Sequence, residues 1–181
     1  MSPSPIAGST RTATALAIVS TVLVGLMAGL FLAFDLSVMP GLAAGDEGTY
    51  VTAMRNFNAA IDGNALFGAV FLLALAAPVV SAVAEYRAGR RGTALWVAVA
   101  ASAYLAALVI TFTVNIPLNN ELASGGPVAQ MTDFSIVEKF KTTWVATNIV
   151  RTLLCTAALV ALARTLVHYG RATAAVAGRP S

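Results

Sequence analysis

Asp35 and Arg151 are the two ionisable residues that lie inside long apolar stretches of this 181-residue chain. An ionised side chain within a membrane span is costly, so it marks a functional site by default. Asp35 lies about one turn before Pro40, and Arg151 lies about two turns after the residue that opens its own span. Opposite charges at similar depth indicate an ion pair or two walls of one wet cavity.

Other polar groups fall at the same depth when the stretches are read as helices. Helical spacing puts Trp144, Asn148 and Arg151 on one face, and it puts Tyr104 and Asn115 on one face of another helix. Asn64 begins a third stretch, with Phe67 and Phe71 below it on the same side, and Asn119 follows Pro117. We predict that Asn64, Asn119 and Trp144 contact a ligand, and that Phe67, Phe71 and Tyr104 form an aromatic floor.

A purely structural role for these residues remains open. Asparagine and arginine side chains between helices often hydrogen-bond one helix to the next, which contributes roughly 0.6–2 kcal/mol per bond. Asn115 and Asn119 flank Pro117, which frees a backbone carbonyl that they can satisfy. A carboxylate at Asp35 near the membrane interface can still reach water.

The composition argues against several kinds of site. The chain has one histidine, His168, and one cysteine, Cys155, so no cluster has metal-ligand or bis-histidine haem spacing. No glycine-rich phosphate loop appears, and a net charge of +3 is too small to indicate nucleic-acid binding. We therefore expect no metal, no cofactor and no nucleic-acid partner. A channel or pump is disfavoured because the cytoplasmic half of the spans is nearly bare of ionisable groups.

The scaffold that positions these side chains is a membrane domain. The chain is 58% hydrophobic and 10% charged, whereas soluble domains are about a quarter charged. Four apolar stretches are long enough to cross a bilayer as helices, which takes about 20 residues. We predict an all-α, four-helix transmembrane bundle over residues 14–168, with spans near 14–38, 62–84, 93–115 and 144–166. Residues 1–13 and 169–181 are predicted to be disordered tails.

The two longer connections carry amphipathic patterns of their own. Tyr50, Met54, Phe57 and Ile61 share one helical face, as do Phe134, Val137, Lys141 and Trp144. We predict two short amphipathic helices on the outer side, which serve as plain connectors or as a lid over a pocket. The Met39-Pro40-Gly41 sequence is predicted to end the first span abruptly.

Several of these segments resemble the anthrone-oxygenase-like family of integral membrane proteins. The matching features are the turn from Met39 to Leu42, the Gly63-Asn64 pair, the Val-Asn-Ile-Pro-Leu-Asn segment at 114–119, and Trp144, Asn148 and Arg151 in one helix. The resemblance covers roughly residues 14–165. Fungal members of that family oxidise an anthrone to an anthraquinone with molecular oxygen, and no metal or flavin is assigned to them.

The resemblance implies a cofactor-independent oxygenase of a small hydrophobic phenolic or polycyclic substrate that reaches the site from the bilayer. Asp35 would then act as the base, and Arg151, Asn148 and Asn115 would hold the oxyanion. A second hypothesis stays open: a non-enzymatic membrane protein that binds a lipid- or quinone-like ligand or assists assembly of another membrane protein. Both hypotheses require a polar pocket with apolar walls.

The distribution of arginine and lysine predicts the orientation. Arg11, the 85–92 loop and the C-terminal tail carry most of these residues, which places both termini in the cytoplasm. The connections at 39–61 and 116–143 then face outward. We expect a multi-pass protein of the plasma membrane.

A reporter enzyme tests this orientation. Fused after Ser181, it should be active on the cytoplasmic side only, because the positive-inside bias holds that end in the cytoplasm. The same reporter inserted in the 116–143 connection should be active on the outer side only. Outer activity of the Ser181 fusion would reject the orientation.

Overall fold

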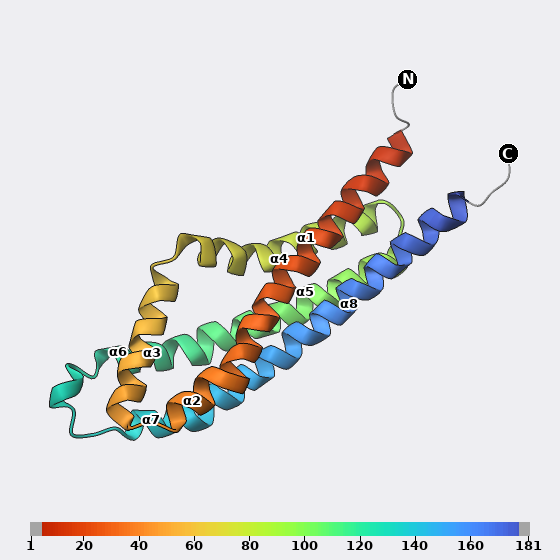
Figure 1. The fold of residues 1–181 in the computed structure, drawn as a ribbon. Coiled ribbons are helices and arrows are strands. Elements are labelled where there is room, and N and C mark those ends of the chain that lie inside the picture. Colours follow the sequence, from red (N-terminus) through yellow and green to blue (C-terminus); the bar gives the residue numbers. More distant parts are fainter. Residues whose placement is uncertain (1–4, 178–181) are drawn as a thin grey trace.

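Four long apolar helices make up most of the protein. The computed structural model describes residues 5–177, with side chains for residues 12–171. Four of its helical segments are long and apolar enough to span a membrane: 12–43, 65–87, 91–124 and 135–171. The chain is therefore a multi-pass membrane protein, and the predicted all-α class is confirmed. Both ends of the described chain lie at one end of the bundle, and we call the opposite end the distal end (Figure 1).

Three of these four segments contain a π-helical stretch and are built from several elements. The first comprises α1 (Pro5–Ala33), η1 (Phe34–Val38) and α2 (Met39–Ala43). The second is α4 (Ala65–Arg87) alone. The third comprises α5 (Arg91–Ile110), η2 (Thr111–Asn115) and α6 (Ile116–Ser124). The fourth comprises α7 (Ser135–Lys139), η4 (Phe140–Trp144) and α8 (Val145–Ala177).

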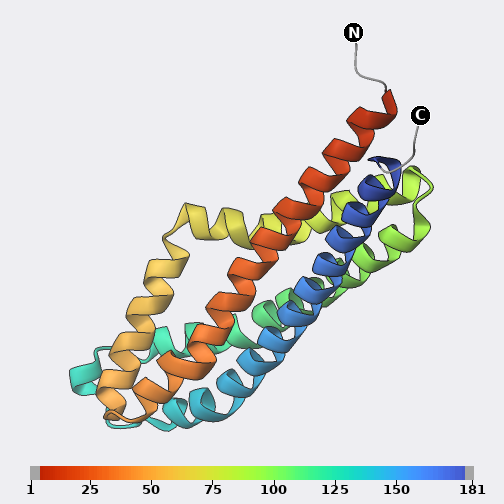
Figure 2. The ribbon, with the colours of Figure 1, turned by 45° about the vertical axis from the view of Figure 1, so that its right-hand side comes forward.

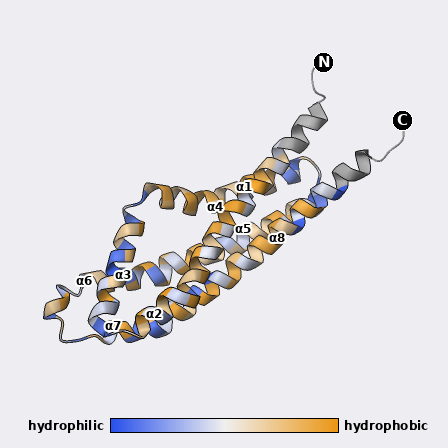
Figure 3. Ribbon diagram, viewed as in Figure 1, coloured by the Kyte–Doolittle hydropathy of each residue, from blue (hydrophilic) through white to orange (hydrophobic). Residues whose placement is uncertain are grey.

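The four long helices pack as a closed ring of neighbours. α1 contacts α4 and α8, and α5 contacts the same two helices. Their shared core includes Val24, Val97, Tyr104 and Leu162, whose side chains are fully buried. Hydrophobic residues dominate all four helices, whereas hydrophilic residues gather at the distal end, in α3 and near α7 (Figure 3). The predicted four-helix bundle is confirmed.

Two of the π-helical segments come just before a proline. η1 ends two residues before Pro40, and η2 ends two residues before Pro117. Proline has no N–H to donate and its ring clashes with the carbonyl four residues earlier, and a wider helical turn relieves both problems. The first helix therefore continues through Pro40 to Ala43, and the prediction that it ends abruptly at Met39–Gly41 is wrong.

The distal end is closed by α3 (Glu47–Asp62), which is the first predicted amphipathic helix. Asp46 caps its N-terminus by accepting bonds from the backbone N–H and the hydroxyl of Thr49, at 2.9 and 2.6 Å. These bonds lower the pKa of Asp46. The inward face of α3 buries Tyr50 and Met54 against Phe140. Burial raises the pKa of Tyr50 to about 12, so its hydroxyl stays neutral.

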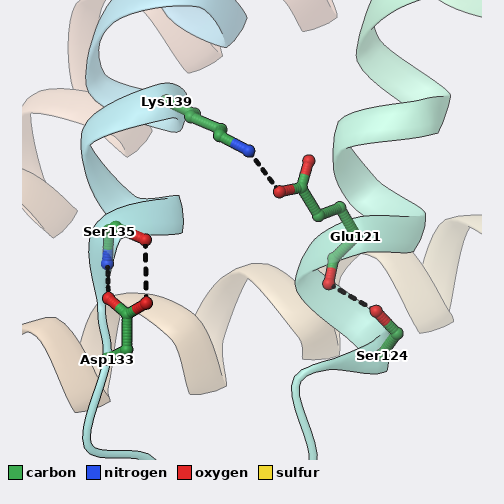
Figure 4. Close-up of polar contacts among 5 residues, drawn as sticks. All are labelled: Glu121, Ser124, Asp133, Ser135 and Lys139. Atoms are coloured by element: carbon green, nitrogen blue, oxygen red, sulfur yellow. Dashed lines mark hydrogen bonds and ion pairs between the residues drawn. The ribbon is translucent and has the colours of Figure 1, made fainter.

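The second predicted amphipathic helix is α7, and it is continuous with the last span through η4. No proline or glycine separates Ser135 from Val145, so nothing ends the helix there. Lys139 of α7 pairs with Glu121 of α6, and Asp133 accepts bonds from the N–H and hydroxyl of Ser135 (Figure 4). The Lys139–Glu121 pair joins α6 and α7 across the distal end, and the Asp133 bonds cap the start of α7.

Arg55 of α3 ties the distal loop to the bundle. Its Nε donates to the Leu122 carbonyl at 2.8 Å, and its Nη1 donates to the Gly126 carbonyl at 2.6 Å. Gly126 has a φ of +73°, a backbone conformation that favours glycine. The loop also contains the short 3₁₀ helix η3 (Val128–Gln130).

Helical structure extends into both predicted tails. α1 begins at Pro5 and α8 ends at Ala177, within the segments 1–13 and 169–181 that were predicted to be disordered. Residues 1–4 and 178–181 lie outside the described part of the chain.

A buried ion pair lies at the end of the bundle that holds the termini, and the sequence analysis missed it. Glu85, near the end of α4, is fully buried, and its carboxylate accepts bonds from Arg90 at 2.6 and 2.8 Å. The Arg90 side chain is 34% exposed. The arginines near 85–92 were used only to predict the orientation, and no pattern in the sequence indicated that Glu85 is buried.

Arg90→Ala should lower the free energy of unfolding by about 1–3 kcal/mol, because it removes the positively charged partner of the buried Glu85 carboxylate. The partial exposure of Arg90 keeps the loss well below that of a fully buried pair. Unfolding in detergent micelles measures it. Arg91→Ala is the matched control, since Arg91 is exposed and forms no ion pair within the described residues. Equal losses in both variants would contradict the prediction.

Candidate functional site

A cavity of about 340 Å³ lies between the distal halves of the four long helices, beneath the end of α3. Its size is within the roughly 300–1,000 Å³ range of ligand pockets. Every long helix and α3 contribute lining residues. The aliphatic and aromatic ones are Leu30, Phe31, Phe34, Ile61, Phe67, Phe71, Leu72, Phe112, Ile116 and Trp144. The others are Asn58, Asp62, Asn64, Gly68, Thr111, Asn115, Asn119, Asn148 and Arg151.

Arg151 is the charged group on the inner wall of this cavity. Its side chain is buried, at 4% exposure, and its guanidinium lies 4.4 Å from the Phe31 ring centre and 5.3 Å from that of Trp144. Nη1 donates to the Thr111 hydroxyl at 3.1 Å, and Nη2 donates to the side-chain oxygen Oδ1 of Asn148 at 2.6 Å. The Thr111 hydroxyl is able to accept because it donates its own hydrogen to the Ala107 carbonyl.

The positive charge of Arg151 has no carboxylate in direct contact. Arg151 forms no ion pair within the described residues, and its Nε finds no acceptor there. Aromatic faces and neutral oxygens stabilise a cation, but they do not neutralise it. A buried cation in this setting favours an anion, or a developing negative charge, in the adjacent cavity.

Asp35 is linked to Arg151 through Asn148 rather than paired with it. The Asn148 amide donates to Asp35 at 2.5 Å and to the Phe31 carbonyl at 2.9 Å, while Thr152 donates to the other Asp35 oxygen at 2.5 Å. Asp35 is half-buried and is not among the residues that line the cavity. Its carboxylate therefore fixes the orientation of Asn148, which presents its oxygen to Arg151.

Asn115, Asn119 and Trp144 form the distal part of the wall. The Asn115 amide donates to the Thr147 hydroxyl at 3.0 Å and to the Trp144 carbonyl at 3.4 Å. The Trp144 indole N–H donates to Asn119 at 3.0 Å. The side-chain oxygen Oδ1 of Asn115 is buried and has no donor among the described residues. These bonds hold η2 and α6 against η4.

Aromatic rings form the wall on the α4 side. Phe67 and Phe71 stack with their ring centres 5.7 Å apart, and Phe112 meets Phe71 edge-on at 6.1 Å. Tyr104 is fully buried below them and donates to the Phe71 carbonyl at 3.0 Å, so it supports the wall from behind and does not line the cavity. A flat aromatic surface of this kind suits a flat aromatic ligand.

The rim next to α3 is polar. Asp62 ends α3, and Asn64 caps α4 by accepting from the Phe67 N–H at 3.1 Å. Both residues are exposed, and both line the cavity together with Asn58. Asp62 is the only carboxylate among the lining residues. It therefore places a carboxylate at the exposed rim of the cavity, whereas Arg151 lies on the buried wall.

The three π-helical segments all contribute to the site. η1 supplies Phe34 and the Asp35 carboxylate, η2 supplies Thr111, Phe112 and Asn115, and η4 supplies Trp144. A π-helical turn inserts one extra residue and re-aims the side chains near it, and such turns are frequent at functional sites. The three segments lie at the same depth in three helices, which indicates that the functional site lies at this depth.

Most of the predicted site residues meet at this cavity. The lining includes Asn64, Phe67, Phe71, Asn115, Asn119, Trp144, Asn148 and Arg151, and it lacks Asp35 and Tyr104. The sequence analysis missed Phe31, Phe34, Asn58, Asp62 and Phe112 as lining residues. Asp62 and Asn64 flank one glycine, which was the available signal for a polar rim. No group of histidine, cysteine, aspartate and glutamate suited to a metal ion occurs within the described residues.

Comparison with known proteins gives one match. The family model described as anthrone oxygenase matches residues 57–161, a range that holds every lining residue except those of α1 and η1. No curated protein and no solved structure matches the chain. Since the matched range covers more than half of the 181 residues, the chain belongs to the anthrone oxygenase family.

Proposed function

We propose that this protein oxidises a flat, hydrophobic phenolic or polycyclic compound, of the anthrone type, with molecular oxygen. The observation that carries the proposal is the buried Arg151 guanidinium, which faces an apolar cavity and has no carboxylate partner among the described residues. A buried cation with no carboxylate in direct contact stabilises an oxyanion more strongly than the same cation would in water.

The chemistry begins with loss of a proton. An anthrone has a weakly acidic C–H across its central ring from the carbonyl, and removing that proton leaves the electron pair delocalised onto the carbonyl oxygen as a phenolate. We assign the phenolate oxygen to Arg151, with Asn148 and Asn115 beside it. The electron-rich anion then reacts with molecular oxygen, and the overall reaction is anthrone plus O₂ to anthraquinone plus water.

Asp62 is better placed than Asp35 to accept the proton. The acidic C–H and the carbonyl lie at opposite ends of the reacting ring, so the base and the oxyanion-binding group must flank the substrate. Asp62 lies on the distal rim, whereas Asp35 bonds to Asn148 and Thr152 outside the lining. We therefore assign proton transfer to Asp62 and a positioning role to Asp35, and the two variants described below separate these assignments.

We also propose that the protein lies in the plasma membrane with both termini in the cytoplasm, as the distribution of arginine and lysine indicates. With both termini in the cytoplasm, the distal end and its cavity lie in the outer half of the plasma membrane. The exposed Asp62 then lies close to the outer aqueous phase. The proton that it accepts returns to the reacting oxygen when water forms, so the overall reaction releases no proton.

A binding function without turnover is the second candidate. The observation in its favour is that Asn115 and Asn148 already bond to neighbouring helices, through Thr147 and the Phe31 carbonyl. Groups that hold helices together in this way also suit a site that only retains a lipid- or quinone-like ligand. Oxygen consumption separates the candidates, because a binder takes up the compound and consumes no oxygen.

Arg151→Met should lower the rate of oxygen consumption with anthrone by roughly 10²–10³-fold, as expected when one oxyanion-stabilising group is lost. Methionine keeps much of the length of the side chain but not its charge. Arg164→Met is the matched control, because Arg164 is also in α8 and also stacks on a ring, that of Trp96, at 4.5 Å. The rate is measured in proteoliposomes and corrected for spontaneous oxidation. Equal rates in parent and Arg151→Met would reject the assignment.

Asp62→Ala should lower the same rate by roughly 10²–10⁴-fold, which is the usual contribution of a general base. Because Asp62 is exposed, added acetate can reach the vacated position, and we expect it to restore part of the rate. Asp35→Ala should also slow the reaction, but acetate should not restore it, since Asp35 acts through Asn148. Restoration in Asp35→Ala and not in Asp62→Ala would reverse the two roles.

A further inference from the structure

Two of the cavity-lining side chains also face the surroundings of the bundle. Leu72 of α4 is 60% exposed and Phe112 of η2 is 54% exposed, although both line the cavity. Both residues belong to membrane-spanning segments, 65–87 and 91–124. Their exposed surfaces therefore meet lipid and not water, which makes this edge of the cavity continuous with the acyl-chain region.

α4 and α5 diverge along this edge of the bundle. In both ribbon views they lie close together near the end that holds the termini and separate towards the distal end, where α3 leads into α4 and contacts α6 (Figures 1 and 2). Gly68 lines the cavity one turn before Leu72, on the same side of α4. A Cβ atom built at Gly68 meets no atom within 4 Å, so the space beside it is open.

We propose that the cavity opens sideways into the bilayer between α4 and η2, past Gly68, Leu72 and Phe112, and that a neutral polycyclic compound dissolved among the acyl chains enters through this opening. The lateral opening narrows the substrates of the proposed function to neutral compounds that dissolve in the bilayer. Only the oxidation that follows entry rests on the proposed function. The opening itself rests on the exposure of Leu72 and Phe112 and on the open space at Gly68.

The chemistry of the walls changes in order from the lipid side inward. Leu72 and Phe112 come first, the stacked Phe67 and Phe71 rings come next, and Arg151 lies on the inner wall. A flat apolar ring system contacts favourable surface at each step, since aromatic rings stack on it. A charged compound would lose its hydration at the apolar edge without a partner, which is strongly unfavourable. The order therefore selects neutral ring systems.

The polar rim at Asp62 and Asn64 offers a competing route from water. The two routes make different predictions about charge. A bilayer route admits neutral anthraquinone and refuses its water-soluble sulfonate, whereas a rim route admits both.

Fluorescence of Trp144 reports binding, because Trp144 lines the cavity. The chain has two tryptophans, so a Trp96→Phe background leaves Trp144 as the single emitter. In vesicles of that protein, neutral anthraquinone should quench Trp144 in a saturable way, and anthraquinone-2-sulfonate should not. Gly68→Phe fills the opening and should slow the onset of quenching by about tenfold, since a blocked approach acts on the association rate.

Gly29→Phe is the matched control. Gly29 is an exposed glycine of α1 with equally open space at its Cβ position, and it does not line the cavity. It should behave as the parent, because its added side chain lies away from the cavity. Circular dichroism and thermal melting check that each variant is folded.

Several results would overturn the lateral opening: equal quenching by the sulfonate, no saturable quenching by anthraquinone, or equal kinetics in Gly68→Phe and Gly29→Phe. The same variants distinguish this failure from failure of the proposed function. Slowed quenching in Gly68→Phe, with no oxygen consumption by the parent, keeps the opening and rejects the oxygenase. Oxygen consumption that is equal in Gly68→Phe and Gly29→Phe keeps the oxygenase and rejects the opening.

Discussion

The burial of the Arg151 guanidinium is the constraint on which the distal half of this bundle depends. A cation within a span costs free energy unless it finds partners, and three different helices supply them here. α1 contributes the Phe31 ring, η2 contributes the Thr111 hydroxyl, and α8 itself contributes Asn148. A direct carboxylate would have neutralised the charge. Asp35 instead bonds to Asn148, which bonds to Arg151. This arrangement holds the Arg151 side chain in position and leaves its positive charge available to the cavity.

The π-helical segments make this arrangement possible in apolar helices. An unbroken α-helix presents one narrow stripe to its neighbours, and Pro40 and Pro117 would each clash with the turn before them. Widening the helix ahead of each proline relieves the clash and brings additional side chains to one level. In η2 the wider turn aims both Thr111 and Asn115 at the neighbouring helix α8 and its extension η4. The π-helical turn that accommodates each proline thus also brings polar groups together in the bundle.

The gross architecture could be predicted from the sequence because hydrophobicity acts over whole spans. Four stretches nearly free of charge have few alternatives to four helices in a bilayer. Individual side chains were harder, because helical spacing assumes a regular α-helix. Asp35 lies within η1, where the extra residue turns it away from the cavity. Tyr104 shares a face with Asn115 in a regular helix but lies behind Phe71. Glu85 was missed for a different reason: its partner Arg90 follows it in the loop, and charged residues in a loop are usually exposed, whereas here the carboxylate is buried.

The match to the family model sharpens what α1 contributes. The matched range begins at residue 57 and so excludes α1 and η1, yet it includes Arg151, Asn148 and the aromatic wall. The polar chemistry of the cavity is therefore carried by α3 through α8. What α1 and η1 add is a ring face for the guanidinium, a backbone carbonyl for Asn148, and the Asp35 carboxylate that orients the same amide. Each of these acts on a group of α8, and Leu30, Phe31 and Phe34 also line the cavity. The first helix completes the ring of four helices and fixes the orientation of the inner wall of the cavity. The apolar lining reaches the lipid on another side of the cavity, where α4 diverges from η2.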